Sequence, residues 1–180
     1  MLGNKYTLTH IRHHDWDKIR EWRNAQIDIL RQELPITETQ QLAYLNAYYS
    51  DLSVQYPHFK RYLFSFLLGI PGAERLIGYG GLVNIDWKNM SAETSFLLDP
   101  SRVKDKNKYR DELIIFHKLL EDATSYMHLH RWHGETFEFR AWHIHCLEEF
   151  GFNCEGIMRD AIRKEGRYLD VVITGKILYE

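Results

Sequence analysis

Residues 61–69 constrain the fold more than any other part of the chain, because apolar residues occupy consecutive positions there instead of alternating with polar ones. A strand that is apolar on both faces is typical of a sheet with helices packed on both sides. The longest apolar run, residues 63–70, is interrupted by Ser65 and Gly69 and is far shorter than the roughly 20 residues of a membrane span. The segment therefore predicts a covered strand within a mixed α/β domain.

Seven segments have the composition or alternation of strands, and four have helical periodicity. The expected strands are residues 5–12, 61–69, 76–86, 92–98, 131–139, 153–163 and 167–178. With the helices, their order is β-α-α-β-β-β-α-β-α-β-β, without repeats or a linker. At 180 residues the chain is expected to form one domain, residues 1–180, of the α/β (α+β) class. We expect a mixed sheet of about seven strands flanked by about four helices.

Capping residues mark the starts of the first two predicted helices. Asp15 is expected to cap the first helix with its side chain. Thr37 and Gln40 have the spacing of a capping box at the start of the second helix, which is expected to run through Leu42, Leu45 and Tyr49. A polar loop then precedes the longest predicted helix, whose apolar residues recur at steps of three and four.

Composition and charge exclude several kinds of protein. The 23 Lys and Arg residues and 25 Asp and Glu residues give a net charge of −2, whereas general nucleic-acid-binding domains are strongly basic. The first residues lack the apolar core of a signal peptide, and Cys146 and Cys154 do not suggest a disulfide framework. We therefore expect a cytoplasmic protein that binds neither nucleic acid nor membrane. Tyrosines concentrated between Tyr44 and Tyr79 fit either a core of large rings or an aromatic-lined cleft.

Five sequence blocks occur in a fixed order along the chain. They are EWRNAQIDILRQ, LIGYGGLVNID, AETSFLLDP, LHRWHGETFEFRAWHIHCLEEFGFNCEGIMRD and GRYLDVVITGKIL. In order and spacing they resemble the GNAT superfamily of acyl-CoA-dependent N-acetyltransferases, in particular the branch with ribosomal-protein N-terminal and amino-sugar acetyltransferases. The resemblance covers most of residues 76–180 and the first predicted helix. It implies an acyltransferase with acetyl-CoA as co-substrate and a V-shaped opening between the fourth and fifth strands.

The resemblance also implies where acetyl-CoA binds. Its pantetheine arm would lie along the fourth strand, against main-chain groups of Phe96, Leu97 and Leu98. Its phosphates would lie at the polar loop before the longest helix, where relatives have a glycine-rich sequence whose N–H groups bind phosphate. The other residues expected to contact acetyl-CoA are Arg102, Lys104, Lys106, Asn107, Lys108, Tyr109, Arg110, Asp111 and Arg140.

The chain departs from the family pattern at this loop and after the fifth strand. Lys108 and Arg110 stand where glycines are usual, so side chains could obstruct the close approach of phosphate to the backbone. The cations of the loop could replace that cradle by direct charge pairing, or could form an ordinary solvated loop. Arg140 stands in place of an asparagine that bonds the pantetheine arm, and Leu147 in place of a tyrosine that protonates the leaving thiolate.

Transfer of an acetyl group to an amine requires a base near the amine. Glu93 is the first candidate, because it shares one face of the fourth strand with Leu97. The alternative for Glu93 is a strand-end carboxylate paired with a surface lysine. Asp86 is the second candidate. His143 and His145 are further options, since histidine titrates near neutral pH, although either could instead cap a helix or face solvent.

The acceptor is expected to bind at the first two helices and the loop between them, as in relatives. The residues expected to contact it are Trp22, Arg23, Asn24, Gln26, Arg31 and Gln32. Arginine and asparagine beside a tryptophan could recognise an anionic or sugar-like group, or could hold the helix pair together. His128, His130 and His133 lack a metal-binding spacing, so no metal is expected.

These observations predict an N-acetyltransferase that acts by direct attack of a primary amine on the thioester. The expected acceptor is a small molecule such as an amino sugar or a sugar nucleotide, and a protein N-terminus is the alternative. A GNAT-like domain that binds acyl-CoA or another ligand without turnover is the alternative function. Cys146 fits packing better than an acyl-enzyme, because a lone thiol on an amphipathic helix is usually buried. The protein is expected to be a monomer or a homodimer.

Overall fold

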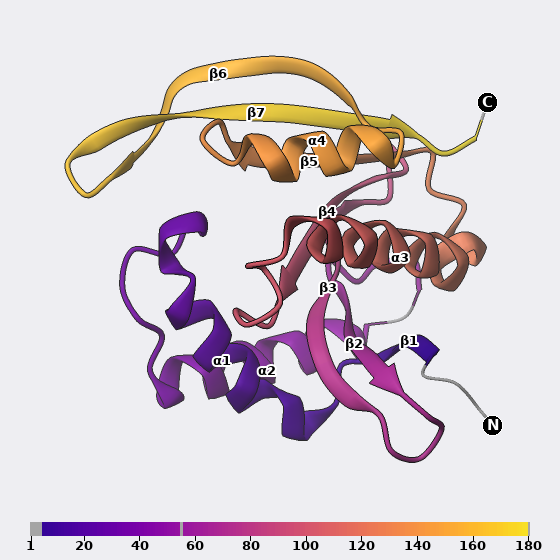
Figure 1. Ribbon diagram of the computed structural model, residues 1–180. Helices are drawn as coiled ribbons and strands as arrows, with labels where there is room; N and C mark the ends of the chain where they lie inside the picture. The colour runs from indigo at the N-terminus through magenta and orange to yellow at the C-terminus, as the bar shows by residue number, and fades with distance from the viewer. Residues whose placement is uncertain (1–4, 55, 180) are drawn as a thin grey trace.

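A computed structural model describes residues 5–54 and 56–179, and its framework is one seven-stranded sheet (Figure 1). The strands are β1 (Lys5–His10), β2 (Tyr62–Gly69), β3 (Arg75–Asp86), β4 (Ser91–Leu98), β5 (Arg131–Phe137), β6 (Asn153–Lys164) and β7 (Arg167–Ile177). Their order across the sheet is β1-β2-β3-β4-β5-β7-β6. All neighbouring strands are antiparallel except β4 and β5, which are parallel. This mixed sheet confirms the expected fold class.

The pairing between β4 and β5 is short. It runs from Ser91 opposite Arg131 to Glu93 opposite His133 and then stops. Beyond Glu93, β4 remains paired with β3 as far as Leu98. The sheet is therefore open between β4 and β5, which confirms the V-shaped opening expected from the resemblance.

The α-helices of the described residues lie on the two faces of the sheet. They are α1 (Trp16–Ala25), α2 (Glu38–Leu52), α3 (Lys106–Thr124) and α4 (Ala141–Glu149), and short 3-10 helices occupy His13–Asp15, Ile27–Ile29 and Ser125–Met127. Phe64 and Phe66 of β2 belong to the hydrophobic cluster under α3 and α4, whereas Leu63 belongs to the cluster under α1 and α2. Because both faces of β2 are covered, its sequence is apolar at consecutive positions.

The capping box of α2 is confirmed, and the cap expected for α1 is wrong. Gln40 N donates to Thr37 Oγ1 (3.2 Å), and Thr37 N donates to Gln40 Oε1 (2.9 Å). Asp15 stands before α1 but makes no side-chain cap. Its buried carboxylate instead accepts from Arg12 Nε (2.7 Å) and Ser65 Oγ (2.6 Å). The guanidinium of Arg12 and the hydroxyl of Ser65, which lies on β2, are therefore the partners of Asp15 in place of the helix N–H groups.

The buried face of α2 also differs from the expected one. Gln41, Leu45 and Tyr48 are buried, whereas Leu42 and Tyr49 are 55% and 38% exposed. The spacing of apolar residues on this helix fits two faces, and contact with α1 and the sheet selects one of them. Within the described residues, no helix is both long enough and apolar enough to cross a membrane.

Candidate functional site

Three cavities adjoin one another along the open part of the sheet. The β4 cavity, of about 490 Å³, lies between the end of β4, the loop before α3 and the start of α4. The cleft cavity, of about 250 Å³, lies where β4 and β5 separate. The helix cavity, of about 540 Å³, lies between α1 and α2. Phe96, Arg140 and His143 line both the β4 cavity and the cleft cavity, and Arg23 lines both the cleft cavity and the helix cavity.

The main chain of β4 turns hydrogen-bonding groups toward the β4 cavity. Asp99 N donates to a carbonyl of β3 (2.9 Å), so by the two-residue period of a strand the main-chain groups of Leu97 also face β3. Those of Phe96 and Leu98 face the opening, where Leu98 O accepts from Gln26 Nε2 (2.9 Å). Of the three residues expected to offer main-chain groups, Phe96 and Leu98 therefore direct them into the cavity, whereas Leu97 contributes its side chain.

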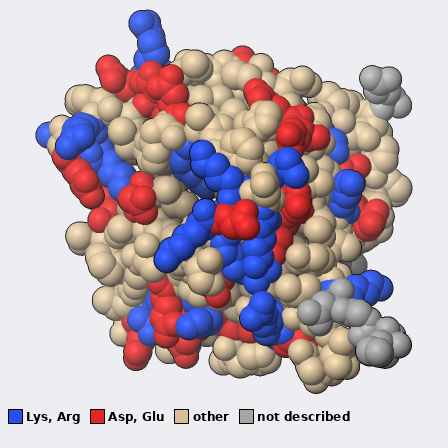
Figure 2. All heavy atoms as spheres, in the orientation of Figure 1, with Lys and Arg blue, Asp and Glu red and all other residues tan. Residues whose placement is uncertain are grey.

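Two of the five cations around the start of α3 already have carboxylate partners. Arg102 is 6% exposed and forms a bidentate ion pair with the fully buried Glu112 (Nε to Oε2, 2.9 Å). Arg110 pairs with the carboxylate that follows it (2.9 Å). Figure 2 shows positive and negative side chains intermixed over α3 in the middle of this face. Lys104 and Lys106 differ, because they line the β4 cavity and no carboxylate partner is found for them among the described residues.

The N-terminus of α3 is capped by its own loop. The Asp105 carboxylate accepts from the N–H groups of Asn107 (3.0 Å) and Lys108 (3.1 Å). The helix therefore begins at Lys106, inside the segment expected to be a loop, and its first free N–H groups already have an anionic partner. Lys108 is exposed and lines none of the three cavities.

Arg140, Tyr109 and His143 form a hydrogen-bonded group where the β4 and cleft cavities meet. Arg140 Nη2 lies 3.4 Å from the Tyr109 hydroxyl oxygen, which lies 2.7 Å from His143 Nδ1. Burial raises the pKa of Tyr109 to about 12. Burial, together with the charge of Arg140, lowers the pKa of His143 well below its ordinary value. At neutral pH the phenol is thus protonated and donates to a neutral imidazole, while it accepts from the guanidinium.

Glu93 lines the cleft cavity, whereas Asp86 is the last residue of β3, next to the turn that leads to β4. Glu93 Oε2 accepts from Asn84 Nδ2 (2.7 Å), and no ion pair of Glu93 with a lysine is found within residues 5–54 and 56–179. Asp86 accepts from the N–H groups of Lys88 and Asn89 (both 3.0 Å), and the hydrogen bonds from Asn89 lower its pKa. Asp86 lines none of the three cavities, so of these two candidates Glu93 is the one that faces the opening.

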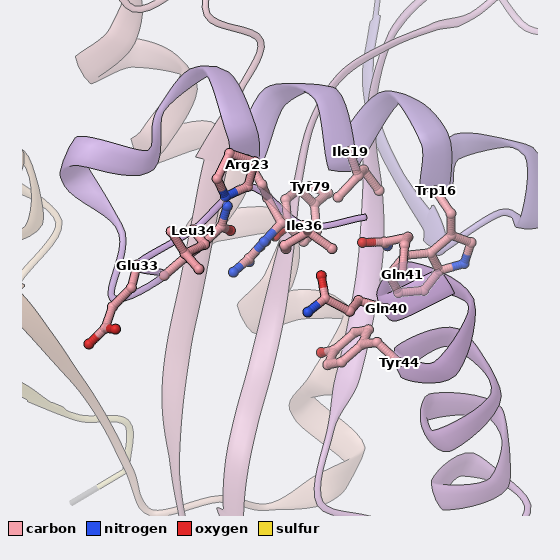
Figure 3. Close-up of a pocket in the computed structure, with 12 residues that line it drawn as sticks. Trp16, Ile19, Arg23, Glu33, Leu34, Ile36, Gln40, Gln41, Tyr44 and Tyr79 are labelled. Atoms are coloured by element: carbon pink, nitrogen blue, oxygen red, sulfur yellow. Dashed lines mark hydrogen bonds between the residues drawn. The ribbon is translucent and has the colours of Figure 1, made fainter. Parts of the chain in front are cut away.

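Arg23 reaches from α1 into the helix cavity. Figure 3 shows it pointing into the space between the helices, toward Gln40 and Tyr44 of α2. Its Nη1 donates to the hydroxyl of Tyr79 on β3 (2.8 Å). Arg23 is therefore placed between the cavity under the helices and the cleft beside β4.

The other residues expected to contact the acceptor mostly stabilise the fold. Trp22 is 4% exposed in the core under α1. Asn24 holds the loop after α1, because its side chain bonds both main-chain groups of Ile36 (3.0 and 2.7 Å) and accepts from Gln32 Nε2 (2.8 Å). Gln26 is buried and binds β4 as described. Gln32 lines the helix cavity, and its Oε1 is buried with no hydrogen-bond partner among the described residues.

The loop after α1 is held over the cleft cavity by the far end of the sheet. Lys164, at the end of β6, donates to three main-chain oxygens within residues 27–32. Arg31 forms an ion pair with Glu135 of β5, and both residues line the cleft cavity. Figure 1 shows the β6–β7 hairpin extending over α4 toward this part of the chain.

Some cavity residues were not singled out from the sequence. Tyr44 and Tyr79 line the helix cavity, and the concentration of tyrosines in this part of the chain was the available signal. Trp142 lines the β4 cavity, with Lys106 Nζ 5.5 Å from its ring centre. Glu135 carries no local signal, because it reaches the cleft only through the separation of β4 and β5.

Comparison with known proteins assigns this arrangement to a family. The family model described as an acetyltransferase (GNAT) domain matches residues 8–173. A spermidine N-acetyltransferase from Vibrio cholerae, solved with CoA and spermine, superposes with a TM-score of 0.75 at 22% identity, over 96% of this chain and 95% of that one. A ribosomal-protein-alanine N-acetyltransferase from Brucella melitensis superposes with a TM-score of 0.71 at 18% identity, over 94% and 98%. No curated protein sequence matches significantly.

Proposed function

Because the chain belongs to the GNAT family of acetyltransferases and takes its acetyl group from acetyl-CoA, we propose that the acceptor is the primary amine of a small molecule such as an amino sugar or a sugar nucleotide. The observation that carries the proposal is the opening between β4 and β5. It joins the β4 cavity, which suits the donor, to the cleft and helix cavities, which suit an acceptor of limited size. The loop held down by Lys164 further favours a small acceptor over an extended peptide.

The residues of the β4 cavity fit acetyl-CoA. The main-chain groups of Phe96 and Leu98 face the cavity at the edge of an open strand, where an extended arm can add as a further strand. Lys104 and Lys106 offer positive charge for the phosphates in place of a glycine-rich cradle. When bound, acetyl-CoA supplies a thioester whose acetyl carbon is open to attack by an amine.

Glu93 is proposed as the base that takes a proton from the attacking amine. It lies on the face of β4 turned toward α1 and α2, and its carboxylate has one hydrogen bond, from a neutral amide. It can therefore accept a proton directly or through water. On the same strand, the N–H of Phe96 faces the opening and is placed to donate to the carbonyl oxygen as charge develops there.

Arg140 is proposed to stabilise the thiolate that leaves. Its guanidinium lies at the junction of the β4 and cleft cavities, and no carboxylate pairs with it in the described part of the chain. The Tyr109 hydroxyl accepts a hydrogen bond from it, and His143 in turn holds Tyr109. A fixed positive charge lowers the free energy of a developing anion, and it offers an alternative to the tyrosine that Leu147 replaces.

Steady-state kinetics with acetyl-CoA tests this proposal, with free thiol as the readout. The acceptors are an amino sugar, a nucleoside-diphosphate amino sugar, spermidine and a short peptide with a free N-terminus. Glu93→Gln is expected to lower kcat by about 100-fold or more while the KM for acetyl-CoA stays nearly constant. Glu165→Gln, in the exposed turn between β6 and β7, is the matched control.

Three results would count against parts of the proposal. An unchanged kcat in Glu93→Gln removes Glu93 from the mechanism. Faster acetylation of the peptide than of the small amines assigns the acceptor to protein N-termini. Calorimetric binding of CoA without transfer to any amine favours the binding module. The cytoplasmic location expected from the sequence belongs to the same proposal, and it is consistent with Cys146 and Cys154 both being free thiols.

A further inference from the structure

Arg23 is unusual among the arginines of the α1 and α2 side of the molecule. The others in this part of the chain each have a carboxylate partner; the pairs are Arg12 with Asp15, Arg20 with Glu38, Arg31 with Glu135 and Arg61 with Asp51. No carboxylate partner is found for Arg23 within the described ranges, and its side-chain hydrogen bond goes to a neutral phenol, that of Tyr79 (2.8 Å). A half-buried guanidinium without an anion is costly, because desolvation is not offset by pairing.

The surroundings of Arg23 suit an anion that comes from outside the chain. The one carboxylate that lines the helix cavity is that of Glu33, and Figure 3 shows it pointing away from Arg23. The rest of the lining is aromatic, aliphatic or amide, including Tyr44 and Gln40. Gln32 Oε1 adds a buried acceptor without a donor, which a hydroxyl or N–H of a ligand could satisfy. The cavity volume of about 540 Å³ exceeds what a single phosphate fills.

We infer that the helix cavity is a subsite for the phosphate-bearing part of the acceptor, with Arg23 as the residue that binds the phosphate. The amine would then lie in the cleft cavity near Glu93, and Arg23 lines both cavities. The inference rests on the proposed function only in taking the cleft cavity as the place of reaction. It gives the acceptor one positive and one negative end, so a polyamine, which carries positive charge at both ends, is disfavoured at this site.

Calorimetry with uridine diphosphate as the probe tests the subsite without turnover. Saturating CoA is present, so that the nucleotide is kept out of the β4 cavity. Arg23→Gln is expected to weaken binding of the nucleotide by about tenfold or more, and Arg23→Lys by less, since a lysine keeps the charge but not the bidentate geometry. Arg20→Gln, on the same helix but outside the cavity, is the matched control and is expected to bind nearly as tightly as the parent. Unchanged affinity for CoA in each variant shows that the fold is intact.

Kinetics with glucosamine, glucosamine 1-phosphate, uridine-diphosphate glucosamine and spermidine separates the two proposals. The subsite predicts a kcat/KM that rises with the phosphorylated acceptors and an increase that Arg23→Gln removes. Binding of the nucleotide that depends on Arg23, without transfer to any amine, would leave the subsite standing and overturn the proposed function. Transfer that is equally fast to spermidine and to phosphorylated amines, absence of nucleotide binding, or equal binding by Arg23→Gln would overturn the subsite.

Discussion

The loop before α3 and the helix cavity differ in the partners that their arginines have. Beside the β4 cavity, Arg102 is buried against Glu112, and the N-terminus of α3 is capped by Asp105. In the helix cavity, Arg23 has a phenol as its partner, and no carboxylate pairs with it among the residues that the structure describes. On the α3 side, charge pairs stabilise the loop itself, whereas on the α1 and α2 side a charge is left for a ligand.

The difference shows that a cluster of cations near an expected phosphate does not by itself identify the residues that bind it. Arg102 and Lys104 are two positions apart, yet one is sequestered in an ion pair and the other lines the cavity. The sequence of the whole segment fits both a solvated loop and direct pairing with phosphate. The structure divides the segment, because Glu112 lies about two helical turns inside α3, where it can reach Arg102.

The largest effect on stability is expected when the buried ion pair of Arg102 and Glu112 is broken. Glu112→Ala leaves the Arg102 guanidinium buried without a partner, so the free energy of unfolding should fall by about 3–5 kcal/mol. Urea denaturation followed by circular dichroism measures the loss. Arg110→Ala breaks an exposed pair nearby and should lower stability far less. Equal losses in the two variants would mean that Glu112 holds Arg102 no more strongly than the exposed pair holds Arg110. Both arginines would then be equally available for phosphate.

The next largest effect is the pH dependence of stability that arises from His117, which lies in the cleft cavity between the two regions. Burial lowers the pKa of His117 to about 4, and the residue lines the cleft cavity. Between about pH 6.5 and pH 4 the unfolded chain therefore binds a proton that the folded chain does not, so stability should fall by about 1 kcal/mol per pH unit as pH decreases through this range.

The pH series is best measured as a difference between variants. His117→Asn should remove this part of the slope, because an asparagine amide can still donate to Leu113 O, which accepts from His117 at 2.8 Å. His145→Asn, at an exposed position on α4, should keep the slope. If the parent and His117→Asn lose stability in parallel between pH 6.5 and pH 4, the imidazole is not held neutral.

A smaller effect is expected from the contacts between Lys164 of β6 and the loop after α1. Lys164→Ala removes three hydrogen bonds to the loop after α1, so amide hydrogen exchange in residues 27–32 should accelerate and the KM for the amine should rise about three- to tenfold. Arg163→Ala, the exposed neighbour on the same hairpin, should change neither quantity. If the KM for acetyl-CoA rises instead of the KM for the amine, Lys164 supports the β4 cavity and not the acceptor side, and the prediction is wrong.

The smallest effect is expected for the lysines that line the β4 cavity. Lys104→Ala and Lys106→Ala should each raise the KM for acetyl-CoA by about two- to fivefold at low ionic strength, and less at high salt, because exposed charges are screened. Lys108→Ala should have little effect, since Lys108 lines none of the three cavities. An equal effect of all three substitutions would restore the loop as a single phosphate-binding unit.

Much of the fold could be read from local patterns. The two-sided apolar composition of β2 and the capping box at Thr37 required no knowledge of distant residues, and both were confirmed. The prediction that Asp15 caps α1 was wrong, because Asp15 instead pairs with Arg12, three positions earlier, and with Ser65, which only the packing of β2 beside α1 brings near. The candidate site likewise contains features that follow from local sequence and others that depend on contacts between distant residues. Glu93 followed from strand alternation, whereas the group formed by Arg140 and Tyr109 spans 31 residues of sequence.

The sequence by itself determined the order and type of the elements, because hydrophobic period, caps and turns act over a few residues, and its motifs were sufficient to identify the family. The tertiary structure alone decided which charged groups are available. Pairing depends on distances between residues far apart in the chain, as when Lys164 meets carbonyls more than 130 positions away. Arg23 and Arg102 look alike in sequence, and only the presence of Glu112 beside one and its absence beside the other sets them apart.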